Sequence, residues 1–116
     1  DAFLARTQIL AIMLPLTSAT ENIVGHAVLH ALPRGARLIN VGRGRLIDDD
    51  ALVAALRSGQ IAAATLDVFR AEPLPAAPHF EGCPNLVLTP HIAGVTAEAN
   101  ERVSFLIAEK VLEVLR

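Results

Sequence analysis

Short apolar runs and amphipathic segments alternate along this chain, and that alternation restricts its fold more than any other feature. Apolar runs typical of strands lie at residues 8–14, 37–41, 62–68 and 86–88. Between them, apolar residues recur at the spacing of a helix. Because a strand–helix unit recurs about every 25 residues, the sequence predicts an α/β fold with a parallel sheet and right-handed crossovers. We expect about four strands with flanking helices.

The segment after the first apolar run predicts a helix. Thr17, Ser18 and Thr20 offer hydroxyl groups that can accept a hydrogen bond from an unpaired amide at a helix start. The apolar face that follows at helical spacing comprises Ile23, Val24, Ala27, Val28 and Ala31. The Pro-Arg-Gly stretch at 33–35 ends this helix. The first apolar run itself, closed by Pro15, is typical of a strand that is buried on both faces.

Two further helices are predicted nearer the C-terminus. The acidic run 48–50 complements the positive end of a helix dipole, and Gly59 suits the left-handed cap of a helix that runs to about Arg57. The proline-rich segment 69–85 is a loop of a length that is usually functional or a linker. Thr96 can then cap a last helix. The apolar stripe of that helix, which we expect to be buried, comprises Val103, Leu106, Ile107, Val111 and Val114.

Composition and charge exclude several classes of protein. The chain has 116 residues, 53% of them hydrophobic, so it can bury a core and is one domain at most. Ten Lys and Arg against twelve Asp and Glu give a net charge of −2, which is not the footprint of a nucleic-acid binder. The longest apolar stretch, residues 9–16, contains Pro15 and is too short to cross a membrane. We therefore expect neither nucleic acid nor a membrane as a partner.

The cysteine content and the first residues bear on location and completeness. Cys83 is the only cysteine, so an internal disulfide is impossible and a cytoplasmic location is expected. The chain opens on Asp1 without an initiator Met, and a predicted strand follows almost at once. We therefore expect it to be a piece of a longer protein.

Polar and special residues follow the carboxyl ends of the predicted strands. Pro15, Arg43, the segment 67–72 and His91 each come just after one of the four apolar runs. In open parallel sheets, ligands bind beyond the carboxyl ends of the strands. We therefore expect these residues to meet on one rim of the sheet.

Three residues on this rim suggest chemistry. Arg43 stands between Gly42 and Gly44, and its guanidinium can bind a carboxylate through two parallel hydrogen bonds, although a solvated surface arginine is the simpler interpretation. A carboxylate at Glu72 would stabilise the protonated form of His91 and make an acid–base pair suited to protonating a carbonyl oxygen. By spacing alone, a solvated Glu72 is the commoner outcome.

The remaining candidates are weaker. His26 and His30 lie four residues apart on a predicted helix and could share a metal ion, but no third ligand is evident and we expect no metal site. Cys83 has no neighbouring histidine, which favours a structural thiol over a reactive one. The G-x-G-x-x-G fingerprint of dinucleotide-binding loops is missing, because Ile47 stands in the place of the third glycine.

Taken in order, segments of the chain resemble the D-2-hydroxyacid dehydrogenase family. The matching segments are Leu14-Pro15-Leu16-Thr17 with Thr20, Leu38 to Gly44, Ile47-Asp48, Ala51-Leu52, Ala55-Leu56, Gly59, Ile61, Ala64, Leu66 to Phe69, Glu72 to Pro75, and Pro84-Asn85 with Thr89 to Gly94. One such motif would be weak evidence, but the ordered set is specific. The resemblance implies that residues 1–116 are a single partial NAD(P)-binding domain, the second half of a Rossmann-like fold with a C-terminal helix. The fingerprint strand and the substrate domain of the family are not in the chain.

The resemblance also implies a function. Members of the family transfer hydride between a nicotinamide and a 2-keto or D-2-hydroxy acid, so NAD or NADP is the expected cofactor, without a choice between them. By resemblance, Arg43 holds the substrate carboxylate, His91 is the acid–base and Glu72 orients His91, while Asp67 contacts the nicotinamide end. The cofactor-binding positions implied are Pro15, Thr20, Val41, Gly42, Arg43, Asp67, His91, Ala93 and Gly94. A homodimer of the full-length protein is also expected.

Two other functions compete with the enzyme. One is a cofactor-sensing interaction module, since the family includes corepressors, and the other is an inactive remnant of a truncated gene.

In the family's topology the first strand here pairs with the fingerprint strand. The sheet of this chain should therefore have an unprotected apolar edge, which pairs with another chain or makes the isolated piece aggregate.

Overall fold

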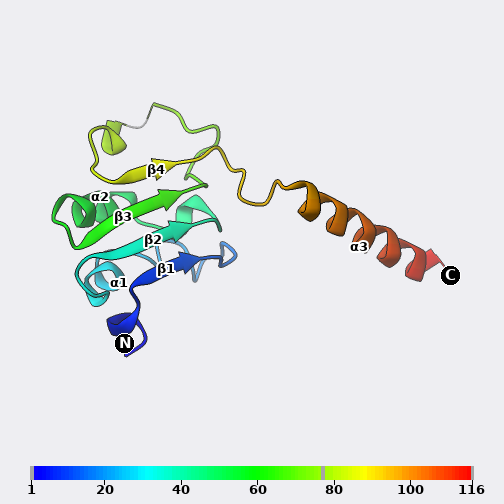
Figure 1. The fold of residues 1–116 in the computed structure, drawn as a ribbon, viewed down its shortest axis with the longest axis horizontal. Helices are drawn as coiled ribbons and strands as arrows, with labels where there is room; N and C mark the ends of the chain where they lie inside the picture. Colours follow the sequence, from blue (N-terminus) through cyan, green and yellow to red (C-terminus); the bar gives the residue numbers. More distant parts are fainter. Residues whose placement is uncertain (1, 77, 116) are drawn as a thin grey trace.

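Four parallel strands form a single sheet in this protein (Figure 1). The structure is a computed structural model, and it describes residues 2–76 and 78–115. The strands are β1 (Ile9–Ile12), β2 (Ala36–Asn40), β3 (Ile61–Leu66) and β4 (Leu86–Leu88), and they lie side by side in the order β1-β2-β3-β4. Every pair of neighbouring strands is parallel. The predicted parallel α/β fold of about four strands is confirmed.

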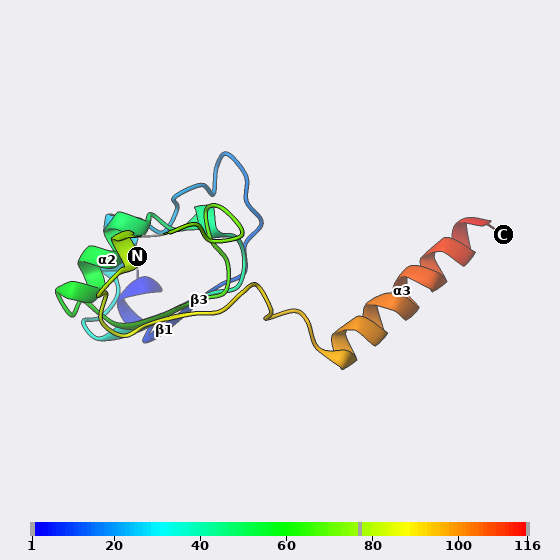
Figure 2. The same ribbon diagram turned by 90° about the horizontal axis from the view of Figure 1, so that it is seen from above.

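The helices that connect the strands lie on one face of the sheet (Figure 2). They are α1 (His26–Ala31) and α2 (Asp49–Arg57). The connections also contain the short 3-10 turns η2 (Gly44–Leu46) and η3 (Pro78–Phe80), and another 3-10 turn, η1 (Leu4–Arg6), precedes β1. The strand order advances in one direction along the sheet, so crossovers of one hand place successive helices on the same side. The core lies between these helices and the sheet. The largest of its fully buried apolar side chains are Leu29, Leu38, Leu46, Ile47, Leu52, Ile61 and Val68.

α2 begins and ends as its sequence predicts. Asp48 caps the helix, because its carboxylate accepts a hydrogen bond from the Ala51 amide at 3.2 Å. Gly59, just past the helix, has φ of +70°, which only glycine adopts without strain. The apolar face of α2 packs on the sheet, and its Leu52 is completely buried. Full burial of one such side chain contributes about 1.5–3 kcal/mol.

The start of the first helix was predicted wrongly. Thr17 and Thr20 do not cap it, because the Thr20 hydroxyl accepts from the Thr17 amide and donates to the Pro15 carbonyl oxygen, both at 2.8 Å. These bonds fold the segment into a turn. Val24 then pairs with Ile47 as an isolated bridge. Side-chain bonding within the turn outcompetes helix capping, so α1 is shortened to six residues.

The burial of β1 also differs from the prediction. The apolar run was typical of a strand buried on both faces, but Ile9 is 57% exposed and only Ile12 of β1 is buried. β1 is an edge strand, and helices of the described residues cover only one face of the sheet. The unprotected apolar edge expected from the resemblance is present in this structure.

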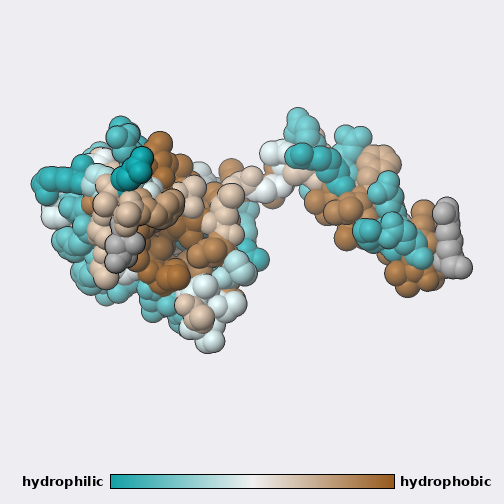
Figure 3. Space-filling model, turned by 90° about the horizontal axis from the view of Figure 1, so that it is seen from below, coloured by the Kyte–Doolittle hydropathy of each residue, from teal (hydrophilic) through white to brown (hydrophobic). Residues whose placement is uncertain are grey.

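The last helix, α3 (Ala97–Leu115), extends away from the sheet (Figures 1 and 2). Thr96 caps it as predicted, because its hydroxyl accepts from the Ala99 amide at 3.0 Å. The prediction of a buried stripe is wrong, because no described residue of α3 is buried. In the space-filling view, apolar side chains gather along one side of α3 and also on the face of the domain that is turned to the viewer (Figure 3). No helix of the described residues is long and apolar enough to span a membrane.

Candidate functional site

The loops that follow the four strands meet at the carboxyl edge of the sheet, as predicted. Pro15 follows β1, Arg43 follows β2, Asp67 follows β3 directly and His91 follows β4. The strands are parallel and adjacent, so these loops lie next to one another in the same order. Contacts between the loops then determine which side chains face each other.

Glu72 and His91 form a close pair across two of these loops. Nδ1 of His91 lies 2.6 Å from Oε2 of Glu72, and the other carboxylate oxygen, Oε1, accepts from the Phe69 amide at 2.9 Å. The hydrogen bond from His91, and then that from Phe69, hold the pKa of the Glu72 carboxyl below its usual range. An ionised Glu72 carboxylate can only accept, so Nδ1 carries a proton in this pair, and Nε2 is the imidazole nitrogen that does not bond to Glu72. The predicted pairing is present in the structure.

The backbone of His91 is in an unusual conformation. Its φ is +55°, in the left-handed region that residues other than glycine seldom adopt. The segment around it is held on both sides by Asp67. Oδ1 of this carboxylate accepts from the Thr89 hydroxyl at 2.6 Å and the Ile92 amide at 2.9 Å, and Oδ2 accepts from the Ala93 amide at 2.8 Å. The loop therefore turns around Asp67, and the turn aims the imidazole at Glu72.

Asp67 is the most buried acidic residue described, with 3% of its surface exposed. Burial raises the pKa of its carboxyl, but the hydrogen bonds from Thr89, Ile92 and Ala93 outweigh burial, and the net pKa is lowered. Both carboxylate oxygens of Asp67 accept hydrogen bonds from groups of this chain. Asp67 therefore shapes the His91 loop, and its contact with a nicotinamide stays a prediction. Thr89 was missed, since a threonine before a proline carries no signal of such a bond.

Arg43 lies on a turn that Asn40 shapes. The Asn40 side chain accepts from the Gly42 amide and donates to the Arg43 carbonyl oxygen, both at 3.0 Å, and Asn40 is only 1% exposed. The guanidinium of Arg43 donates to the Gly42 carbonyl oxygen at 2.7 Å and is close enough to Glu72 to help lower its pKa. Asn40 was missed by the sequence analysis. Its only signal was a polar residue at the end of an apolar strand.

Gly44 brings the loops of Arg43 and Glu72 into backbone contact. A Cβ on Gly44 would stand 1.9 Å from the carbonyl carbon of Phe69 and 2.4 Å from the amide nitrogen of Arg70. Only glycine permits this approach. The contact brings the Arg43 turn close to the amide that holds Glu72.

Two cavities open beside these residues. One, of about 520 Å³, is lined by Met13, Leu14, Pro15, Leu16, Val41, Gly42 and Arg43. The other, of about 300 Å³, is lined by Phe69, Glu72, Pro73, Leu74, Pro90 and His91. Four predicted cofactor positions thus share the first cavity, and His91 lines the second. Thr20 instead folds its own turn, while Ala93 and Gly94 are exposed on the His91 loop.

Comparison with known proteins shows to which family the chain belongs. A sequence model described as D-isomer specific 2-hydroxyacid dehydrogenase, NAD binding domain, matches residues 1–93. The chain belongs to the D-isomer specific 2-hydroxyacid dehydrogenase family. It corresponds to the C-terminal half of the family's NAD-binding domain. The match ends before α3, whose exposed stripe lies outside it.

Individual relatives agree with this assignment. The chain is similar to a glyoxylate reductase of Thermofilum pendens, with 41% identity over 116 residues, which are 100% of this chain and 34% of that protein. A crystal structure of a D-isomer specific 2-hydroxyacid dehydrogenase from Xanthobacter autotrophicus, in complex with NADPH and MES, has a TM-score of 0.80 and 42% identity over 97% of this chain and 47% of that chain. A glyoxylate reductase structure from Paecilomyes thermophila has a TM-score of 0.86 and 32% identity, covering 99% and 35% of the two chains. The chain spans about a third of the length of the curated relatives it matches.

The other histidines and Cys83 make contacts of their own. The rings of His26 and His30 stack on α1 with centroids 6.5 Å apart, and no group of three possible metal ligands occurs among the described residues. Cys83 is half-buried against the core, and burial raises the pKa of its thiol, which is typical of a structural cysteine. His79 lies 3.5 Å from Asp49, which holds η3 near the start of α2.

Proposed function

We propose that this chain supplies the acid–base and carboxylate-binding residues of an enzyme that reduces a small 2-keto acid to a D-2-hydroxy acid, and catalyses the reverse oxidation, with NAD or NADP. The observation that carries the proposal is the 2.6 Å pair of His91 and Glu72 on a rim that it shares with Arg43. The names of the relatives, glyoxylate reductases among them, support the same reaction class. They do not favour a corepressor-like module or an inactive remnant.

The proposed roles follow from charge. Arg43 binds the substrate carboxylate with its planar guanidinium, which also faces the keto oxygen. His91 donates the proton on Nε2 to the keto oxygen as negative charge develops there, and in the oxidative direction Nε2 accepts it back. Glu72 holds the imidazole by Nδ1–H and stabilises its protonated form. Preplaced charges of this kind stabilise the transition state without reorganising.

The larger of the two cavities supports a cofactor site. Its volume of about 520 Å³ is in the range of small-molecule sites, and its walls combine apolar side chains with backbone at Val41 and Gly42. We assign the nicotinamide end to this cavity, with Pro15, Val41, Gly42 and Arg43 as lining residues. Thr20, Asp67, His91, Ala93 and Gly94 remain further predicted cofactor positions. When bound, NAD(P)H supplies the hydride that reaches the carbonyl carbon. The chain's own residues position the acid and the anion site beside it.

Steady-state kinetics of three variants test the proposed roles. In the protein as its gene encodes it, activity is measured with glyoxylate, hydroxypyruvate, pyruvate and phenylpyruvate, each with NADH and NADPH. His91→Gln should lower kcat by roughly 10²–10⁴-fold, because general acid help is lost. Arg43→Gln should raise KM for the keto acid, because the carboxylate loses its partner, and should lower kcat, because the guanidinium no longer stabilises the charge that develops on the keto oxygen.

His30→Gln is the matched control, since His30 is an exposed histidine on α1 away from the rim. It should leave both constants within about twofold. If His91→Gln and Arg43→Gln behaved like this control in an active parent, the assigned roles would be wrong. If the parent were inactive on all four 2-keto acids, the proposed function would be wrong.

A homodimer and a cytoplasmic location belong to the same proposal. The single, half-buried Cys83 supports a reducing compartment. Light scattering of the protein as its gene encodes it gives the number of chains in the assembly, and a monomer would remove the dimer from the proposal.

A further inference from the structure

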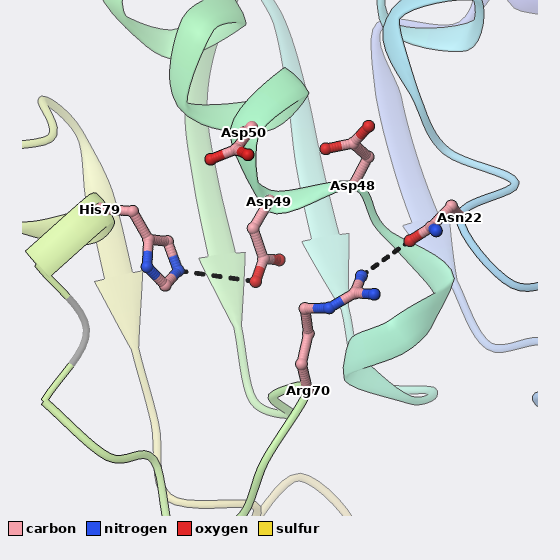
Figure 4. Close-up of a pocket in the computed structure, with 6 residues that line it drawn as sticks. All are labelled: Asn22, Asp48, Asp49, Asp50, Arg70 and His79. Carbon is pink, nitrogen blue, oxygen red and sulfur yellow. Dashed lines mark hydrogen bonds and ion pairs between the residues drawn. The ribbon is translucent and has the colours of Figure 1, made fainter.

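Arg70 connects three loops of the rim, although neither its sequence context nor the proposed reaction assigns it a role. It lies between β3 and Glu72. Its Nη1 donates to Oδ1 of Asn22 at 2.7 Å and to the carbonyl oxygen of Ile47 at 2.9 Å. Figure 4 shows the guanidinium reaching from its own loop toward Asn22, beneath the start of α2.

Each bonded partner belongs to a different strand-to-helix loop. Asn22 lies in the loop after β1, which carries Pro15, and Ile47 lies in the loop after β2, which carries Arg43. Arg70 itself lies in the loop after β3, which carries Glu72. The Arg70 side chain therefore joins the three loops that carry Pro15, Arg43 and Glu72.

The connection reaches the His91–Glu72 pair through one residue. Phe69 precedes Arg70, and its amide donates to Glu72 at 2.9 Å. Its carbonyl carbon faces Gly44 at a distance that leaves no room for a Cβ. A shift of Arg70 would therefore move the Phe69 amide, and with it the carboxylate that holds His91.

Arg70 is an exposed residue, and it also lies beside the acidic start of α2. A cavity of about 390 Å³ is lined by Asn22, Asp48, Asp49, Asp50, Arg70 and His79. Burial raises the pKa of the Asp49 carboxyl, the charges of Arg70 and His79 oppose that rise, and those of Asp48 and Asp50 add to it. The positive charge of Arg70 therefore stabilises the ionised form of Asp49, at the start of α2, in addition to the hydrogen bonds that Arg70 makes with Asn22 and Ile47.

We propose that Arg70 is a positioning residue, which sets the distance between the Arg43 turn and the Glu72–His91 pair by tying their loops to Asn22 and Ile47. This inference rests on the proposed function for its effect on catalysis. The effect of Arg70 on the position of Glu72 can be tested without any activity. Arg70 acts through other residues and contacts neither substrate nor cofactor.

Substitution of Arg70 and Asn22 tests the inference in the protein as its gene encodes it. Arg70→Met keeps the aliphatic stem and removes both hydrogen bonds, so kcat/KM should fall by roughly tenfold, mostly in kcat, because a displaced catalytic group costs rate. Asn22→Ala should give a smaller loss in the same direction. The double variant should be no worse than Arg70→Met, because the two residues act through one contact.

Arg45→Met is the matched control. Arg45 forms an ion pair with Glu21 at 2.6 Å, so it joins the loops after β1 and β2 but does not reach the loop of Glu72. Its variant should stay within about twofold of the parent. Equal losses in Arg45→Met and Arg70→Met, or fully additive losses for Arg70 and Asn22, would overturn the inference.

A spectroscopic readout separates this inference from the proposed function. The carboxyl of Glu72, followed by carbon NMR, should titrate at higher pH in Arg70→Met than in the parent, because the Phe69 amide is displaced. Arg45→Met should leave this titration unchanged. An inactive parent with a shifted Glu72 titration would refute the enzyme and keep the positioning role, whereas an unshifted titration would refute the positioning role.

Discussion

Gly44 shows how much of this site depends on a single missing side chain. Alanine at this position would overlap the Phe69 backbone, where its Cβ would lie 1.9 Å from the carbonyl carbon. Gly44→Ala should therefore lower the free energy of unfolding by about 1–3 kcal/mol, the usual cost of overpacking. It should also lower kcat, because the Arg43 turn is pushed away from Glu72. Urea unfolding and steady-state kinetics measure the two effects.

Gly94→Ala is the control for stability. A Cβ on Gly94 meets nothing within 4 Å, and its φ is not in the left-handed region. Its free energy of unfolding should stay within about 0.5 kcal/mol of the parent. Equal stability of the two alanine variants would show that the loops do not touch at Gly44.

Asp67 should make stability depend on pH. Its folded pKa is lowered, so its contribution is fully present above the ordinary aspartate value of 3.8 and is lost as pH falls through the folded value. In Asp67→Asn, the NH₂ group replaces one carboxylate oxygen. It cannot accept a hydrogen bond, so a backbone amide that bonds to that oxygen in the parent loses its acceptor. The free energy of unfolding should fall by about 1–3 kcal/mol at neutral pH.

The same substitution should flatten the acid limb of the stability curve. Urea unfolding of parent and Asp67→Asn at several pH values below 5 measures it, and the difference between them should shrink as pH falls. Thr89→Val, which removes one of the three donors to Asp67, should have a smaller effect in the same direction. A pH-independent difference would mean that the Asp67 carboxylate is not stabilised by these donors.

At the scale of elements, the N-terminal cap of α2 can be tested by substitution. Asp48→Ala removes the side-chain acceptor of the Ala51 amide and should cost about 0.5–2 kcal/mol of unfolding free energy. Asp50→Ala, in the same first turn but exposed, keeps the cap and should cost at most about 1 kcal/mol through the helix dipole. Thermal unfolding compares the two, and the order of their costs would reverse if Asp48 were not the cap.

Elements whose signals are local were predicted well. β4 has the predicted bounds, and β2, β3 and α2 agree with prediction to within two residues, because apolar runs, the acidic run 48–50 and Gly59 are local signals in the sequence. α1 failed because Thr17 and Thr20 bond within their own turn. α3 was predicted as a helix, but its burial was not predictable, since an apolar stripe indicates only that some surface covers it.

For the whole molecule, the open edge of the sheet has a consequence. β1 offers unpaired backbone groups beside exposed apolar side chains, Ile9 among them. The 116-residue chain expressed by itself should therefore self-associate. Size-exclusion chromatography with light scattering at several concentrations measures this. Ile9→Lys, a charge on the edge strand, should shift the distribution toward monomer, whereas a monodisperse parent monomer would contradict the expectation.

By itself, the sequence determined which segments become strands and helices and which residues stand at the carboxyl ends of the strands, because periodicity, caps and chain order are local properties. Only the tertiary structure decided which polar atoms meet. The bond between Thr89 and Asp67 joins residues 22 apart, and that between Arg70 and Asn22 joins residues 48 apart. Such bonds depend on the directions of side chains across neighbouring loops, and spacing along the chain carries no information about direction.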